Sequence, residues 1–146
     1  MTHRGLQRAR SRRDEGQVAV FVVLVTVAVV MFAGLVVDGG LALAAKVRAI
    51  GEAQEAARSG AQAIDLAAYR NNGSVRLLPA EARRRAHEYV AATGDTGRVK
   101  TTTSTVTVTI TAHQRTQFLG LLGLDTLTVT ATGTAHPVQG VEAPER

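Results

Sequence analysis

The sequence contains no cysteine and no tryptophan, and aromatic residues make up only 3% of its 146 residues. Without cysteine the chain forms no disulfide, performs no thiol chemistry and offers no cysteine ligands for zinc or iron–sulfur sites. Aromatic side chains supply much of the volume of an ordinary core, so their scarcity argues against a large self-sufficient core. The sequence therefore indicates one modest domain with a small core.

The chain carries a net charge of +5, but its basic residues are gathered in patches. A nucleic-acid-binding face would spread them along a groove with interleaved aromatics, so we expect no nucleic-acid partner. Five arginines precede a long apolar run near the N-terminus: Arg4, Arg8, Arg10, Arg12 and Arg13. Basic residues in that position usually mark the cytoplasmic side of a membrane span.

Residues 17–37 include no charged side chain and are almost entirely apolar. A helix of about twenty residues is about 30 Å long, which matches the hydrocarbon core of a bilayer. We therefore expect a basic cytoplasmic leader over residues 1–16, a transmembrane helix over 17–37, and an extracytoplasmic remainder from Asp38 onward. The expected location is the cell membrane, with a single pass and the lipid bilayer as a partner.

A cleaved secretion signal is an alternative, because Ala42, Leu43 and Ala44 form an A-x-A triplet downstream of the run. The apolar stretch exceeds the 7–15 residues of a typical signal core, and Asp38, Gly39 and Gly40 interrupt the approach to the triplet. A secreted protein cut near Ala44 is kept as a second hypothesis.

Residues 38–70 have the pattern of an amphipathic, alanine-rich helix that continues from the span. Its apolar residues recur at steps of three or four: Leu43, Val47, Ile50, Ala53, Ala57, Ala61, Ile64 and Ala68. Such a narrow stripe favours close approach to a flat partner. We expect Asp38 to cap or hinge this helix, Gly39 and Gly40 to loosen the junction, and the turn-forming residues 71–74 to end it.

The rest of the chain predicts a short helix and a small sheet. Within residues 71–98, a linker and second helix, proline and glycine signals place the helix from Pro79 to Gly94. Residues 99–136 alternate apolar residues with threonine in two segments, from Val99 and from Leu127, as strands do. We expect an antiparallel sheet covered on one side by the long helix and wet on its threonine side.

Smaller features complete this α+β, pilin-like fold. The apolar residues between the two strand segments, Phe118 to Leu124, are predicted to form a short helical or looped plug that closes one end of the core. A short third strand is expected around residues 74–78, and residues 137–146 are expected to be a flexible tail. A sheet this small is marginal without a covering partner, which indicates that the domain works within an assembly.

No pattern of residues predicts catalysis. The chain has four scattered histidines, and none has a second histidine or a carboxylate at the spacing of a metal site on a helix face: His3, His87, His113 and His136. The nucleophile elbow, phosphate-binding glycine loop and zinc-protease motifs are all missing. We expect no enzyme activity, no cofactor and no metal site.

The opening run "GQVAVFVVLVTVAVVMFAGLVVDGG" and the following "EAQEAARSGAQAI" together resemble the TadE/TadG-like proteins of tight-adherence (Flp) pilus assembly, especially the TadG-like N-terminal region. The resemblance extends from Gly16 to Ile64. It implies a non-catalytic, single-pass bacterial protein, either a pilin-like subunit or an assembly factor, with other pilus-assembly subunits as partners. Asp38 is then either an interfacial residue that ends the span or, with Gly39 and Gly40, a contact with another assembly subunit.

The same resemblance implies cutting by a prepilin peptidase after Gly16, which would make Gln17 the new N-terminus. The fifth residue after that cut is Phe21, where true pilins and TadE-like proteins usually carry glutamate. Phe21 cannot accept the charge-assisted hydrogen bond through which that glutamate registers one subunit against the next. The departure favours a TadG-like protein that stays anchored. A membrane-anchored extracytoplasmic binding module unrelated to pili remains an alternative.

Overall fold

The computed structural model describes the backbone of residues 6–138 and the side chains of residues 16–138. Its elements are α1 (Leu6–Ala61), α2 (Leu66–Asn72), α3 (Pro79–Thr93), β1 (Thr96–Thr101), β2 (Val106–Arg115), the 3-10 turn η1 (Leu119–Leu122) and β3 (Thr126–Ala135). The expected α+β fold is confirmed. The start of the predicted leader, residues 1–5, and most of the predicted tail, residues 139–146, lie outside the described residues.

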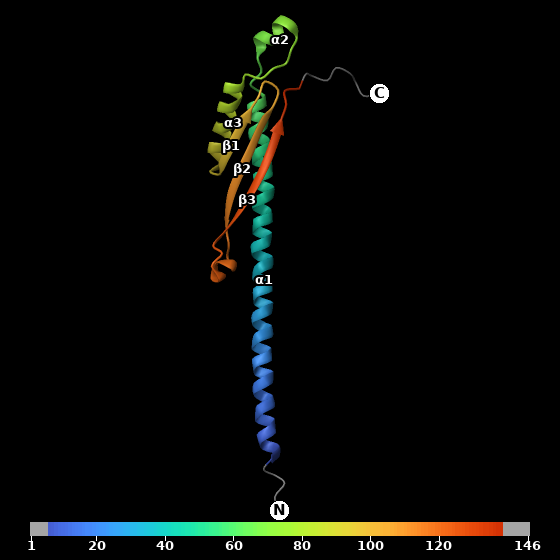
Figure 1. The fold of residues 1–146 in the computed structure, drawn as a ribbon, viewed down its shortest axis with the longest axis vertical. Coiled ribbons are helices and arrows are strands. Elements are labelled where there is room, and N and C mark those ends of the chain that lie inside the picture. The colour runs from blue at the N-terminus through green and yellow to red at the C-terminus, as the bar shows by residue number, and fades with distance from the viewer. Residues whose placement is uncertain (1–5, 139–146) are drawn as a thin grey trace, which may run out of the picture.

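Helix α1 is one uninterrupted helix, and α3, β2 and β3 pack along its C-terminal part (Figure 1). The cap or hinge expected at Asp38 and the loosened junction expected at Gly39 and Gly40 are both wrong, because α-helical structure continues through all three residues. The predicted end of the helix at Arg70 is also wrong. The helix stops at Ala61, and a new N-cap at Asp65 starts α2 by accepting hydrogen bonds from two backbone amides, each 3.0 Å long.

The three strands form an antiparallel sheet in the order β1-β2-β3, which confirms the expected orientation. The segment predicted as one strand from Val99 belongs to two strands, joined by a tight turn in which the Thr102 amide donates to the Thr105 carbonyl over 2.8 Å. The sheet does have three strands, but the third one is β1 and not the strand expected around residues 74–78. The strand expected over residues 74–78 is reduced to an isolated bridge between Leu77 and Ile64.

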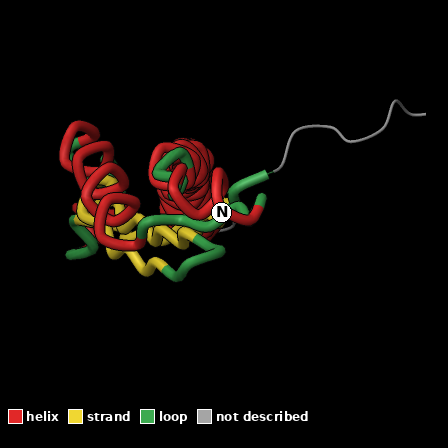
Figure 2. Tube along the Cα trace, turned by 90° about the horizontal axis from the view of Figure 1, so that it is seen from above, coloured by secondary structure: helices red, strands yellow, loops and turns green. Residues whose placement is uncertain are grey.

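Helices α1 and α3 lie on the same face of the sheet, so the domain has two layers (Figure 2). Helix α3 begins at Pro79 and is followed by Gly94 in the left-handed region, as its sequence signals predict. The inward residues of β2 are buried and its threonines are half-exposed, which confirms the predicted division of the sheet into an apolar face and a wet face.

The interface between α1 and the sheet is made of small residues. The buried stripe of α1 consists largely of alanines: Ala45, Ala49, Ala53, Ala56, Ala57 and Ala61. Leu43, Val47 and Ile50, which were predicted to share this face, are exposed instead. The reason is the close approach of β3, where a Cβ added to Gly133 would lie 2.5 Å from the Ala53 carbonyl oxygen. A side chain larger than a methyl group does not fit between α1 and β3 at that distance.

Candidate functional site

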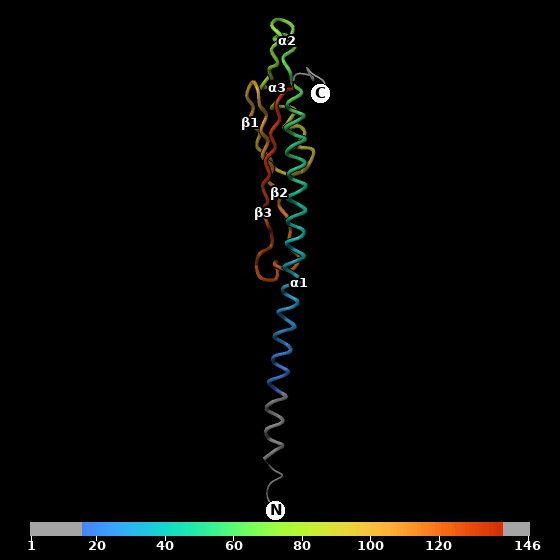
Figure 3. The backbone as a smooth tube through the Cα atoms, turned by 90° about the vertical axis from the view of Figure 1, so that its right-hand side faces the viewer, coloured from blue at the N-terminus to red at the C-terminus, as the bar shows by residue number. Residues whose placement is uncertain are grey.

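The apolar part of α1 extends away from the sheet as a bare helix (Figures 1 and 3). Its large side chains are exposed, including Phe21, Phe32 and Val36. Among the described residues it is the single helix long and apolar enough to cross a membrane. Thr26, a polar residue within the run, donates its hydroxyl to the Val22 carbonyl at 2.8 Å, so it needs no partner outside the helix. Such an exposed apolar surface is compatible with the hydrocarbon core of a bilayer.

Asp38 stands where the bare helix meets the folded domain, and it is 1% exposed. Its carboxylate accepts three backbone hydrogen bonds from the loop between β2 and β3, from Gln117 (2.6 Å), Phe118 (2.9 Å) and Leu119 (2.7 Å). Backbone amides aimed at a carboxylate stabilise its charged form and fix the geometry of the donor loop. Asp38 therefore joins α1 to a loop about eighty positions later in the chain.

One turn below Asp38, Gly34 permits a close contact with the same loop. A Cβ at Gly34 would lie 2.6 Å from the Cβ of Phe118 and 2.7 Å from its Cγ, too near for any side chain without displacement of the phenylalanine. Gly34 and Asp38 are one helical turn apart and face the same side. Together they form a seat for the β2–β3 loop.

The loop itself is not the core plug that the sequence predicts. No residue of η1 is buried, and the core cluster of the domain includes none of residues 118–124. The loop instead bounds an apolar recess of about 200 Å³ against the bare helix. The recess is lined by Val30, Met31, Leu35, Phe118, Leu119, Leu121 and Leu122. The tip exposes large apolar groups, with Leu121 86% exposed.

The other site residues named from the sequence are not brought into this junction. Gly16, Gln17 and Phe21 lie on exposed helical turns of α1 far from the sheet. Gly39 and Gly40 are exposed, and a Cβ on either would meet nothing within 4 Å. Processing after Gly16 and a subunit contact at residues 38–40 both stay predictions.

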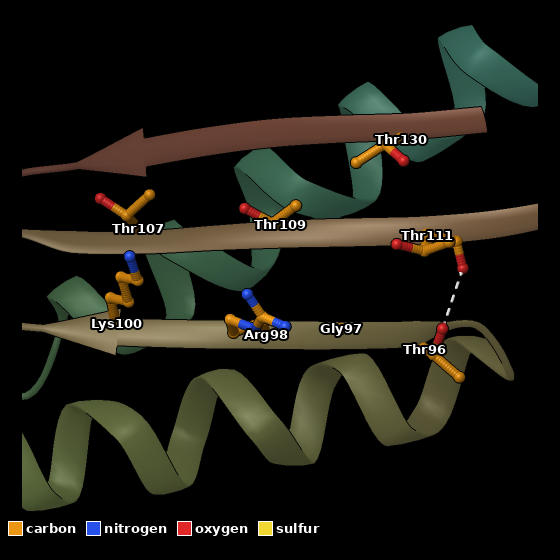
Figure 4. Close-up of a pocket in the computed structure, with 8 residues that line it drawn as sticks. All are labelled: Thr96, Gly97, Arg98, Lys100, Thr107, Thr109, Thr111 and Thr130. Atoms are coloured by element: carbon orange, nitrogen blue, oxygen red, sulfur yellow. Dashed lines mark hydrogen bonds between the residues drawn. The ribbon is translucent and has the colours of Figure 1, made fainter.

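The threonine face of the sheet carries a shallow hollow of about 520 Å³ (Figure 4). Its lining residues are Thr96, Gly97, Arg98, Lys100, Thr107, Thr109, Thr111 and Thr130. Figure 4 shows Arg98 and Lys100 reaching from β1 over the same face as the threonines of β2. Thr109 and Thr132 approach each other across the strands at 3.2 Å.

Two charged clusters lie on the helices. Arg48 contacts Glu52 at 3.7 Å and Asp95 at 3.5 Å. Burial, with Asp95 close by, raises the pKa of Glu52 above its ordinary value. On α3, hydrogen bonds from Arg84 and Arg85 lower the pKa of Glu81 to about 2. These pairs explain part of the arginine-rich face that the sequence presents at residues 83–85.

The contact between Asp38 and the loop is the feature that sequence reasoning missed. The sequence did contain one signal of the loop's role. A hairpin connection with nine residues in a row without a charged side chain, residues 116–124, is an unusual feature in a chain that also has an expected membrane span. Its partner on α1 was not readable, since no local pattern relates residue 38 to residues 117–119. Within the described residues, no group of three histidine or acidic side chains could hold a metal ion.

Comparison with known proteins adds one finding. A family model for TadE/G-like proteins of Flp pilus assembly matches residues 16–63. The match covers the bare part of α1, the seat at Gly34 and Asp38, and the alanine stripe beneath the sheet. Searches of curated proteins and of solved structures found no match. Residues 16–63 of this chain are therefore similar to the TadE/G-like proteins of Flp pilus assembly, which confirms the resemblance predicted from the sequence.

Proposed function

We propose that this protein is a non-catalytic, single-pass membrane assembly factor of an Flp pilus apparatus. Its leader would lie in the cytoplasm and its domain, from Asp38 onward, outside. The observation that carries the proposal is the coincidence of the TadE/G-like match with α1, whose first part is bare and apolar and whose second part organises the sheet. Five arginines before the span support this orientation.

We further propose that the chain stays uncut. Helix α1 passes through Gly16 and Gln17 without a break, so a peptidase would first have to unwind it there. Phe21 also lacks the carboxylate that registers pilin subunits. Cleavage after Ala44 would divide the same helix directly before Ala45, which is buried.

Intact-mass measurement of membrane and secreted fractions from the native cells tests this point. We expect a full-length chain in the membrane fraction. A chain beginning at Gln17 would refute the anchored form and favour a filament subunit, and a secreted chain beginning at Ala45 would refute the membrane protein altogether.

The part of α1 just beyond the span offers a surface for another assembly subunit. Leu43 and Val47 are 65% and 62% exposed there, whereas Ala45 and Ala49 on another side of the same turns are buried. With Ile50, which is 37% exposed, they form an apolar stripe along one side of the helix. A contiguous exposed apolar patch marks a surface for protein–protein or membrane contact. We propose that a membrane-anchored partner of the apparatus packs on these residues.

Surface pili, measured in a sheared fraction, test the function as a whole. Deletion of the gene should abolish or reduce them, and so should the pair Leu43→Ser and Val47→Ser at an equal level of protein in the membrane. Leu66→Ser is the matched control, because Leu66 is 58% exposed but lies on α2, outside the matched residues. Normal piliation in the deletion strain would refute a pilus role and favour an anchored module with another task.

A further inference from the structure

We propose that the β2–β3 loop is a second membrane-inserted element, with its tip, residues 118–124, in the lipid boundary of the outer leaflet beside α1. The inference rests on the proposed span and assigns to the loop a ligand, the acyl chains and headgroup boundary of the bilayer. Figure 1 shows the loop at the lower end of the sheet, alongside the bare helix.

The depth of the loop follows from its contacts with α1. Phe118 packs over Gly34, and the recess beside it is lined by Val30, Met31 and Leu35. All four helix residues belong to the uncharged stretch 17–37. From Val30 to Val37 the helix rises about 10 Å. An amphipathic element at a membrane surface buries its apolar side to a depth of about 5–10 Å. A bilayer around residues 17–37 therefore also surrounds the tip of the loop.

The composition of the loop suits that depth. Residues 116–124, "TQFLGLLGL", include no charged side chain, and the nearest charges, Arg115 and Asp125, stand at the two strand ends. Leu121, Leu122 and Leu124 are more than half exposed. The apolar tip with its charged neck has the polarity profile of the boundary between acyl chains and headgroups.

The backbone of the loop is prepared for a medium without water. Unpaired backbone amides are costly in hydrocarbon, so irregular segments there need internal partners. Asp38 accepts from Gln117, Phe118 and Leu119, as described above. The amides of Leu121, Gly123 and Leu124 donate to carbonyls within the loop at 3.0–3.1 Å. If the loop were exposed to water, water molecules could pair with these amides. Asp38 takes the place of water as their acceptor.

The bilayer is a better occupant than a second copy of the chain or another protein. The exposed tip is continuous with the bare face of the span through the shared recess, so the lipid that surrounds one surface reaches the other. With both α1 and the loop in the bilayer, the lower end of the sheet is held at the membrane surface. Figure 3 shows strands and helix running alongside each other, as this arrangement requires.

Site-directed spin labelling of the full-length protein in phosphatidylethanolamine–phosphatidylglycerol vesicles tests the proposal. Because the chain has no cysteine, each variant carries one label. Leu121→Cys probes the tip, Phe32→Cys gives a lipid reference at a similar depth, and Thr107→Cys gives a reference on the wet face of the sheet. Collision with oxygen, which concentrates in lipid, is compared with collision with a water-soluble nickel complex.

We expect the oxygen-to-nickel ratio at position 121 to approach that at position 32 and to exceed that at position 107 several-fold. A ratio at 121 equal to that at 107, with 32 in lipid, would overturn the loop insertion and leave the span intact. Nickel access at 32 as well would overturn the span itself. A label at 121 shielded from both reagents would show a protein partner and would equally refute the lipid contact.

Discussion

The contact between Gly133 and α1 predicts that one added methyl group weakens the domain. In Gly133→Ala, the new Cβ would lie 2.5 Å from both the Ala53 carbonyl oxygen and the Gln54 nitrogen, about 0.9 Å inside ordinary van der Waals contact. Both neighbours are backbone atoms of a helix, so no side-chain rotation relieves the clash. Overpacking of this kind costs about 1–3 kcal/mol.

Gly51→Ala is the matched control. Gly51 lies within the same helix, and a Cβ there meets nothing within 4 Å. Alanine in place of a helical glycine stabilises by about 0.5–1 kcal/mol. The two glycine-to-alanine changes should therefore move stability in opposite directions.

Urea unfolding of the full-length chain in detergent micelles, followed by circular dichroism, measures both effects. With a slope of about 1–3 kcal/mol/M, a loss of about 2 kcal/mol lowers the unfolding midpoint by about 0.7–2 M. A Gly133→Ala protein that unfolds at the same or a higher urea concentration than the parent would refute the close approach of β3 to α1.

Three further predictions concern carboxylates. Asp38→Ala should speed hydrogen exchange of amides 117–119 by about tenfold or more, whereas Asp65→Ala, which removes the cap of α2, should leave those amides protected. Unchanged exchange at 117–119 in Asp38→Ala would contradict the hydrogen bonds between Asp38 and the β2–β3 loop. Glu81 has a depressed folded pKa of about 2 against an ordinary 4.5, so its contribution to stability is present above 4.5 and lost as the pH falls between these values. In Glu81→Gln, the urea midpoint should fall less steeply with decreasing pH across that interval than it does in the parent protein. An equal slope in the two proteins would show that Glu81 does not contribute to the acid dependence of stability. Glu52 has a raised folded pKa, so its contribution is present below its unfolded pKa and lost as the pH rises through the folded one. Glu52→Gln should therefore raise the urea midpoint at neutral pH, and a lower midpoint would show that the ion pair with Arg48 dominates.

The elements with strong periodicity were predictable from the sequence. The apolar run, the helix between Pro79 and Gly94, and the alternation of Val106, Val108 and Ile110 with threonines each determine one local structure by themselves. These patterns express which side chains face a core, and a single segment is enough to read them. The α+β class and the antiparallel sheet follow from them.

The features that were predicted wrongly from the sequence depend on contacts with residues elsewhere in the chain. The turn at residues 102–105 contains no glycine, proline or asparagine, and is held by hydrogen bonds such as that from the Ser104 amide to the Thr102 hydroxyl at 3.2 Å. Helix α1 stops at Ala61 as the chain turns to pair Ile64 with Leu77. The choice of alanines over Leu43 and Val47 for the packing face depends on Gly133, which the helix sequence does not contain.

The candidate site divides in the same way. Residues 16–63 were identifiable because a membrane run and a small-residue helix are local properties. The role of Asp38 was not, since its three donors are contributed by a loop 79–81 residues away. An isolated carboxylate at the end of an apolar run looks the same whether it faces water, a partner or its own chain.

The unbroken course of α1 gives the protein the mechanics of a lever. From Asp38 to Ala61 the helix extends about 35 Å beyond the span, and no hinge separates the two parts. Spans adjust to thinner bilayers by tilting, and transmembrane helices are tilted by about 20° on average. A change of about 10° in tilt would then carry the far end of the domain sideways by about 6 Å. Local bilayer thickness would thus set the lateral position of the surface presented to neighbouring subunits.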